Sequence, residues 1–309
     1  MLRTIGPPRQ ALRGSPDQLN RPTQTTSKPR SSAATQQETT NVAEISATDV
    51  MKLRNQTGLS MMECKKALAE AGGDFARAED ILRKAMKGKM DTKTDRPAGA
   101  GRVAVAVRGD SAAIVEVRAE TDFTAMNEKF VAACNRIAEL VLDQPAGAVA
   151  GFADAQRLID ELRISTGENC SYARGRKYKG GVFGAYVHHD GKTGALVQAE
   201  GDVTPDVLKQ VCMHIVAKVP TPKGVSPNDI PAEIVDRERK FRIDQAMESG
   251  KPKEIAEKMV EGGMRKFYEE VALLEQPYVM DESKRVKDVI GSAKVMAFSR
   301  YAVGESAGA

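Results

Sequence analysis

The hydrophobic period of this chain changes at residue 102, and this change limits its fold more than any other feature of the sequence. Up to about residue 88, apolar residues recur at the three- and four-residue spacing of helices. Beyond residue 102 they alternate on both sides of a Gly109-Asp110 turn, at Val103, Val105 and Val107 and then at Ala113, Val115 and Val117. Alternation across a glycine turn predicts a β-hairpin. The chain therefore combines helices with strands, which is typical of the α+β class.

Helical patterns follow this hairpin. The stretch from Thr124 to Leu142 predicts one helix with a single apolar face, made of Phe130, Ala133, Ile137 and Leu140 or Val141. A second helix is expected near Asp154 to Arg163. Residues 102–180 are therefore expected to form one α+β subdomain.

A similar unit recurs further along the chain. Its expected elements are a strand at 182–187, a turn at Asp190-Gly191, a strand at 195–197 and a helix that begins after Thr204 with Pro205. The two units align approximately, at Ala113–Glu116 with Ala195–Gln198 and at Cys134–Ala138 with Cys212–Val216. This duplication predicts two related subdomains with antiparallel sheets. The second comprises residues 181–230 and 275–303, because the final stretch is expected to return to it.

Three helices are predicted before the sheets, within residues 44–88. Their start signals are the capping-box pairs Ser46-Asp49 and Ser60-Glu63 and a third cap at Asp74. Residues 89–101 contain proline and glycine and are expected to be a linker.

The segment 231–274 has a charged, helical pattern that is interrupted only at Ser249–Pro252. Its apolar residues are too few for a globular core: Ile234, Phe241, Ile255, Met259 and Phe267. They suffice for a narrow seam between two helices. We therefore expect a protruding antiparallel helical hairpin, in the manner of a coiled coil.

The first 40 residues are rich in Arg, Ser, Thr and Pro, poor in acidic residues and free of aromatic residues. Such a composition does not support a folded core. A basic, acid-poor N-terminus is typical of organelle transit peptides. We therefore expect a disordered transit peptide for the mitochondrion, with the plastid as the alternative. A disordered tail without a targeting role is the other interpretation.

Composition argues against several classes of function. The net charge is only +4, with much of the excess in the first 40 residues, so nucleic acid is not an expected direct partner. No apolar run approaches the length of a membrane span. The four cysteines are widely spaced and histidines are few, so neither a metal site nor a cofactor is expected. Gly191-Lys192-Thr193 lacks the first glycine of a phosphate-binding loop, because Tyr186 occupies that position.

Several motifs resemble those of the elongation factor Ts family. They are Leu53–Gly58, Met61–Leu68 and Gly73-Asp74 in the first module, Glu120–Phe123, Asn127–Phe130 and Met213–Ile215 in the subdomains, and Ser249–Gly262 in the hairpin. The resemblance extends over about residues 44–303. It implies a first module similar to ubiquitin-associated domains. It also implies a non-enzymatic exchange factor that promotes GDP release from the GTPase elongation factor Tu during translation elongation.

The resemblance further implies which residues contact the GTPase. Asp122 and Phe123, flanked by Thr121 and Thr124, enter it near its bound magnesium, with the phenylalanine between two helices. Its nucleotide-binding domain is also contacted by residues of the first module and the second subdomain, namely Arg54, Met61, Met62 and His214. The family often has Val and Lys where this chain has Thr124 and Met126. The hairpin reaches another part of the partner and is often absent from animal mitochondrial versions.

Residue types alone leave other interpretations open. Without the family, Phe123 is more often a core residue and Asp122 a helix cap. Paired methionines can pack in a core, Arg54 can be a solvated helix residue, and His214 can be half-buried. The first module alone is also compatible with a scaffold that binds ubiquitin-like proteins or the ribosome. That alternative leaves the duplicated subdomains and the hairpin unexplained.

Overall fold

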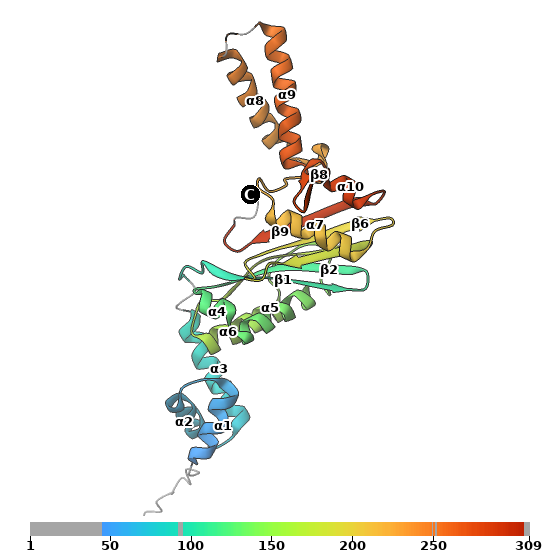
Figure 1. Cartoon of the computed structure of the whole chain (residues 1–309). Coiled ribbons are helices and arrows are strands. Elements are labelled where there is room, and N and C mark those ends of the chain that lie inside the picture. The colour runs from blue at the N-terminus through green and yellow to red at the C-terminus, as the bar shows by residue number, and fades with distance from the viewer. Residues whose placement is uncertain (1–44, 92–94, 249, 251, 306–309) are drawn as a thin grey trace, which may run out of the picture. The chain divides into compact units, whose positions relative to one another are not determined.

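The computed structural model of the chain describes residues 45–91, 95–248, 250 and 252–305. The predicted transit peptide at residues 1–40 lies outside the described residues. Helices and antiparallel sheets are both present, which confirms the α+β class (Figure 1). Among the helices of the described ranges, none has the length and apolar character needed to cross a bilayer.

The first sheet has the strand order β1-β2-β4-β3, and all of its pairings are antiparallel. Its elements and the helices between them are β1 (Ala100–Arg108), β2 (Ser111–Ala119), α4 (Asp122–Met126), α5 (Glu128–Val141), β3 (Gly147–Val149), α6 (Ala153–Thr166) and β4 (Ser171–Lys179). Helix α5 packs on β1 and β2, and α6 packs on α5 and β4. Both helices therefore cover the same face of this sheet (Figure 1).

The second sheet has the order β5-β6-β9 and is also antiparallel. Its strands are β5 (Val182–Val187), β6 (Thr193–Glu200) and β9 (Lys294–Ala302), and α7 (Pro205–Ala217) packs on β5 and β6. Smaller elements precede β9: η1 (Pro227–Asp229), η2 (Leu273–Glu275), β7 (Pro277–Tyr278), β8 (Asp281–Arg285) and α10 (Val286–Ile290). In the final stretch of the described residues, β9 pairs with β6.

The two sheets pack against each other, and the alternation along their strands explains how. In β2, Val115 belongs to the core shared with α5, whereas Ile114 packs between the sheets. In β6, Val197 belongs to the core shared with α7, whereas Leu196 joins Ile114 between the sheets. Residues aligned by the predicted duplication therefore occupy equivalent positions, with one apolar layer on each face of each sheet.

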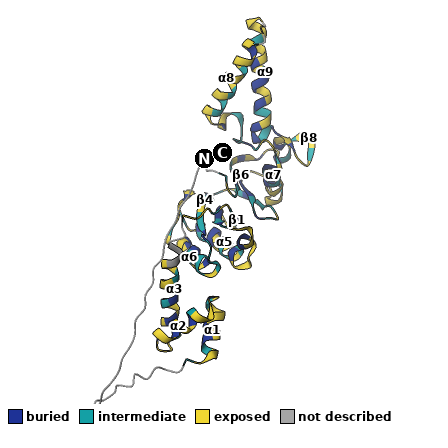
Figure 2. Ribbon diagram, turned by 90° about the vertical axis from the view of Figure 1, so that its left-hand side faces the viewer, coloured by how far each residue is buried: buried dark blue, intermediate teal, exposed yellow. Residues whose placement is uncertain are grey.

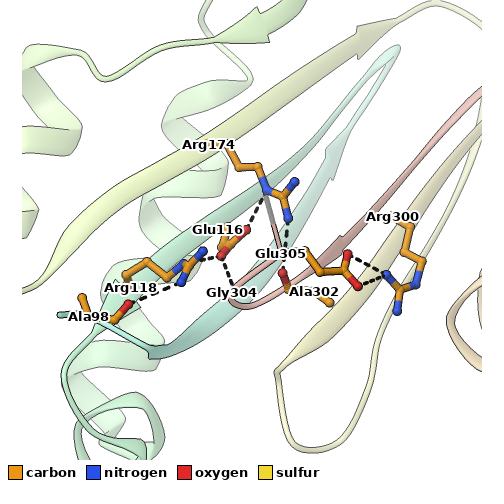
Figure 3. A network of polar contacts seen from close by, with 8 residues as sticks. All are labelled: Ala98, Glu116, Arg118, Arg174, Arg300, Ala302, Gly304 and Glu305. Carbon is orange, nitrogen blue, oxygen red and sulfur yellow. Dashed lines mark hydrogen bonds and ion pairs between the residues drawn. The ribbon is translucent and has the colours of Figure 1, made fainter. Parts of the chain in front are cut away.

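A buried carboxylate also lies between the sheets (Figure 3). Glu116 is fully buried and accepts hydrogen bonds from Arg174 Nε at 2.6 Å and from the Gly304 amide at 3.1 Å. Arg118 forms an ion pair with Oε1, the oxygen that also accepts from Gly304. Arg174 in turn donates to the carbonyl of Ala302 at 3.2 Å, at the end of β9. This network connects the first sheet to the last strand of the second and leaves the buried charge compensated.

The three predicted N-terminal helices are α1 (Ala47–Thr57), α2 (Met61–Glu70) and α3 (Phe75–Asp91). Ser46 caps α1, and Ser60 with Glu63 forms a complete capping box on α2. Gly58 ends α1 with a φ of 74°, a left-handed conformation that favours glycine. These helices bury their own apolar cluster, which includes Leu53 and Leu68.

The predicted helical hairpin consists of α8 (Ala232–Glu248) and α9 (Lys253–Val271). The residues predicted for its seam were partly wrong, since Phe241, Ile255 and Met259 are exposed. Phe267 was predicted correctly, and the buried seam also contains Ala246, Val260, Met264 and Val271. Most of these residues lie on α9, whereas Ala246 is the buried residue of α8 (Figure 2).

Two further expectations for the sheet units need correction. The helix predicted from Thr124 to Leu142 is interrupted at Asn127, which adopts a φ of −64° and a ψ of 136° and caps α5. A local cap therefore replaces the continuous helix that periodicity predicted. Strand β4 was not predicted, because its alternating arginines and lysines resemble a solvated segment. It pairs with β2 and β3, and Glu116 compensates the charge of Arg174 on this strand.

Candidate partner-binding site

Residues Thr121–Met126 form a corner between β2 and α5, which we call the α4 corner. The Thr121 backbone is extended, and its Oγ1 accepts a hydrogen bond of 3.3 Å from the Thr124 amide, which starts α4. Asn127 is extended again, and its Oδ1 accepts from the Lys129 amide at 2.9 Å, which starts α5. The helical backbone is therefore interrupted on both sides of α4, so this short helix stands apart from α5.

Phe123 of the α4 corner has the highest exposed fraction, 90%, of the large apolar residues in the described part of the chain. Met126 is 64% exposed, whereas Thr124 and Ala125 are buried and attach α4 to the core. When another surface covers an aromatic ring that is exposed to water, the free energy of the system falls. The corner therefore presents a ring suited to contact with a partner, and the interpretation of Phe123 as a core residue does not hold.

Asp122 pairs with a lysine from the other sheet unit. The Lys192 ammonium lies 2.9 Å from Oδ1 and 3.1 Å from Oδ2 of Asp122. Both side chains are about half exposed, so the pair lies at the surface. Lys192 follows the turn between β5 and β6, so the second sheet supplies the counter-ion for a carboxylate of the first unit.

Thr121 is held by a second carboxylate. Its Oγ1 donates to Glu168 Oε1 at 2.6 Å, and its amide donates to Glu168 Oε2 at 3.1 Å. Glu168 lies just after α6, so the helix that packs on the core also supports the start of the corner. Neither Glu168 nor Lys192 was among the predicted site residues. No local pattern could have identified them, because each acts on a residue far away in the chain.

The predicted contact residues of the first module are exposed. Arg54 lies in the last turn of α1, and Met61 and Met62 start α2 with exposed fractions of 39% and 77%. None of the three belongs to the buried core of this module. They lie on the helical module rather than on the sheet unit that carries the α4 corner, and their contact with a partner stays a prediction.

His214 differs from the other predicted contact residues because its side chain is fully buried. Its Nδ1 accepts a hydrogen bond from the Val279 amide at 3.2 Å, and its Nε2 lies 3.0 Å from Gln276 Oε1. The Nε2 nitrogen therefore donates to Gln276. Burial lowers the pKa of His214, so its neutral form is favoured. In the free chain His214 supports the turn that contains the exposed residues Val279 and Met280, and its own contact with a partner stays a prediction.

Across the described residues, no cluster of three or more His, Cys, Asp or Glu side chains could hold a metal ion. All four cysteines are buried. Burial raises the pKa of the Cys170 thiol to about 11 and that of Cys212 to about 12, so neither forms the reactive thiolate near neutral pH.

Comparison with known proteins connects this geometry to a family. The family described as elongation factor TS matches residues 120–305, a range that begins directly before the α4 corner. The chain belongs to the elongation factor Ts family. An elongation factor Ts from Thiobacillus denitrificans is 40% identical over 276 residues, which covers 85% of this chain and 93% of the relative. Another from Photorhabdus laumondii is 42% identical over 269 residues, covering 84% and 93%.

Membership of the elongation factor Ts family confirms the resemblance found in the sequence motifs. The chain is accordingly a nucleotide exchange factor for elongation factor Tu and not an enzyme. The activity of this family is therefore to bind and change another protein, and not to transform a substrate.

Proposed function

We propose that this chain releases GDP from elongation factor Tu by inserting the α4 corner near the magnesium site of the GTPase. The observation that carries the proposal is the 90% exposure of Phe123 on a corner held by caps on both sides. Buried neighbours fix the backbone, so the ring is available without local unfolding. Phe123 serves as an apolar wedge and Asp122 as the adjacent charged group.

The proposed mechanism needs no covalent chemistry. A GTPase holds GDP through backbone amides, a lysine and a magnesium ion that bridges phosphate oxygens. A protein that binds the nucleotide-free form more tightly than the GDP-bound form must weaken GDP binding by the same factor. Burial of Phe123 between two helices of the partner, available only when those helices separate, supplies this difference in affinity.

Asp122 has the chemistry to act on the magnesium ion. Magnesium prefers carboxylate, phosphate and water oxygens as ligands. A carboxylate brought close to the ion competes for its coordination shell or for the groups that hold it. Asp122 is adjacent to Phe123 and half exposed, so one movement of the corner brings both groups to the partner.

The remaining predicted contacts extend the proposed interface. Met61 and Met62 offer flexible apolar surface, and Arg54 offers a positive charge from the first module. His214 is proposed to contribute through the Val279 turn that its ring supports. The helical hairpin is proposed to reach another part of the GTPase, with its exposed Met247 among the apolar residues available there.

A fluorescent-nucleotide assay tests the proposed function. Elongation factor Tu loaded with fluorescent GDP is mixed with excess unlabelled GDP and a substoichiometric amount of the full chain. We expect the release rate to rise in proportion to the chain, with each copy acting on many GTPase molecules. A rate equal to spontaneous release would contradict the proposal.

A pull-down separates exchange from the scaffold alternative. The exchange mechanism predicts a stoichiometric complex with elongation factor Tu that dissociates when GDP and Mg²⁺ are added. Recovery of ubiquitin-like proteins or ribosomal RNA in place of the GTPase would favour the scaffold.

We also propose that the protein is an organellar form of elongation factor Ts that retains the helical hairpin. Its basic, acid-poor residues 1–40 support mitochondrial targeting, with the plastid as the alternative. Residues 1–40 fused to a fluorescent protein should accumulate in mitochondria of a eukaryotic cell. Fluorescence confined to plastids would select the alternative, and diffuse fluorescence in the cytosol would contradict targeting.

A further inference from the structure

The turn between β5 and β6 is fixed to both of its neighbours. The carbonyl of Gly191 accepts a hydrogen bond of 2.8 Å from the Val103 amide of β1, and the carbonyl of Lys192 accepts one of 2.8 Å from the Val303 amide. Asp190 Oδ1 accepts from the Lys192 amide at 2.8 Å. Gly191 has a φ of 73°, which suits glycine and lets the turn stay tight. The backbone that carries Lys192 is therefore held by the first sheet, by the end of the second and by the turn itself.

From this fixed turn Lys192 reaches the α4 corner, where its ammonium contacts both oxygens of Asp122 at 2.9 and 3.1 Å. The corner is held from the other side by Glu168, which binds the backbone amide and hydroxyl of Thr121. The two anchors come from different sheet units. Between them they restrict where the Asp122 carboxylate lies, next to the exposed ring of Phe123.

We propose that Lys192 is a positioning residue for nucleotide exchange, which holds the Asp122 carboxylate in its productive orientation before the GTPase docks. This inference rests on the proposed function, because it assigns Lys192 a role through Asp122. An exposed ion pair contributes little to the stability of the fold. Its effect is to reduce the number of orientations that Asp122 must lose on binding, which is the advantage of a pre-organised contact.

The inference predicts a distinct pattern of exchange rates. Lys192→Ala should lower the efficiency of GDP release about twofold to fivefold, the factor that corresponds to the ~0.5–1 kcal/mol typical of one exposed ion pair. Lys192→Arg keeps the positive charge and a donor within reach of the carboxylate, and should restore most of the rate. In an Asp122→Ala background, Lys192→Ala should have no further effect, because the group it positions is absent.

The control is Arg157→Ala, which removes an exposed cation of α6 that pairs with Asp154 at 3.2 Å, away from every proposed contact. It should leave the rate at the wild-type value, and circular dichroism should show equal helical content in all variants. Equal rates for Lys192→Ala and wild type would overturn the inference. Additive losses in the double variant would also overturn it, since Lys192 would then act on the partner directly. Faster exchange in Lys192→Ala would mean that the lysine masks Asp122, which is the opposite role.

The outcomes also distinguish this inference from the proposed function. If wild-type chain does not accelerate GDP release, the proposed function fails, and the positioning role of Lys192, which rests on it, fails as well. If wild type is active and Lys192→Ala matches it, the exchange function stands and only the positioning role is lost.

Discussion

Replacement of Phe123 by alanine is expected to impair exchange while leaving the fold intact. In the free chain its ring is 90% exposed, so the free energy of unfolding should change by no more than about 0.5 kcal/mol, as for other surface substitutions. In the complex, burial of the same ring is expected to contribute about 1.5–3 kcal/mol to the binding free energy. At about 1.4 kcal/mol per factor of ten, the efficiency of GDP release should fall roughly 10- to 150-fold.

The assay compares two phenylalanines that lie close together in the sequence. Fluorescent-GDP release is measured over a range of chain concentrations, and urea unfolding is measured on the same preparations. Phe130 is fully buried on α5, so Phe130→Ala should lower the free energy of unfolding by about 3–5 kcal/mol. Val107→Ala removes apolar surface from a residue 51% exposed on β1 and should change neither quantity appreciably.

Two results would refute this reasoning. If Phe123→Ala catalyses release at the wild-type rate, the exposed ring is not the wedge. If it loses stability on the scale expected for Phe130→Ala, the ring is buried in the free chain, and a slower rate would report unfolding rather than a lost contact.

Three further substitutions test other parts of the structure. Glu116→Ala leaves two arginines without their shared carboxylate and should lower the free energy of unfolding by about 3 kcal/mol in urea. Gly184→Ala places a Cβ 2.3 Å from Leu208 atoms of α7 and should cost about 1–3 kcal/mol in the same assay. Because burial lowers the pKa of His214, wild-type thermal stability should fall as the pH decreases through about 6.5, and His214→Gln should weaken this dependence.

The sign of the pH effect follows from proton binding. The unfolded chain protonates this histidine near pH 6.5, whereas the folded chain does so only at lower pH. The stability contributed by the neutral ring is therefore complete above that pH and is lost below it. Identical pH profiles for wild type and His214→Gln would contradict the account, and His188→Gln, which changes a less buried ring, is the control.

The two other substitutions have their own tests. A loss below about 1 kcal/mol for Glu116→Ala would mean that water or another group replaces the carboxylate. Gly262→Ala is the control for Gly184→Ala, because a Cβ at Gly262 meets no atom within 4 Å and alanine favours helix. Equal stability of these two glycine variants would mean that Gly184 of β5 and Leu208 of α7 leave room for a Cβ.

Local signals predicted most of the fold. Helix starts were correct where a side chain caps its own backbone, as at Ser60 with its capping box and at Thr204 before Pro205. The hairpin of β1 and β2 was correct because alternation and the Gly109-Asp110 turn are both local. The break at Asn127 was missed because apolar periodicity continues through it, although its side chain caps the next helix.

Long-range contacts account for what the sequence could not predict. In strand β4, Arg174 donates to Glu116, and the two residues are 58 positions apart. Asp122 and Lys192 are separated by 70 positions, so no motif joins them. The α4 corner was identified through its resemblance to a family, and its exposure could not be predicted because an isolated phenylalanine is more often buried.

The most direct test of the account compares the affinity of the chain for two forms of elongation factor Tu. Calorimetry would measure binding of the full chain to the nucleotide-free GTPase and to the GTPase saturated with GDP and Mg²⁺. We expect tighter binding to the empty form, by the same factor by which the chain weakens GDP binding. Equal affinity for both forms would contradict it, because a protein that binds both states equally cannot shift the GTPase toward nucleotide release.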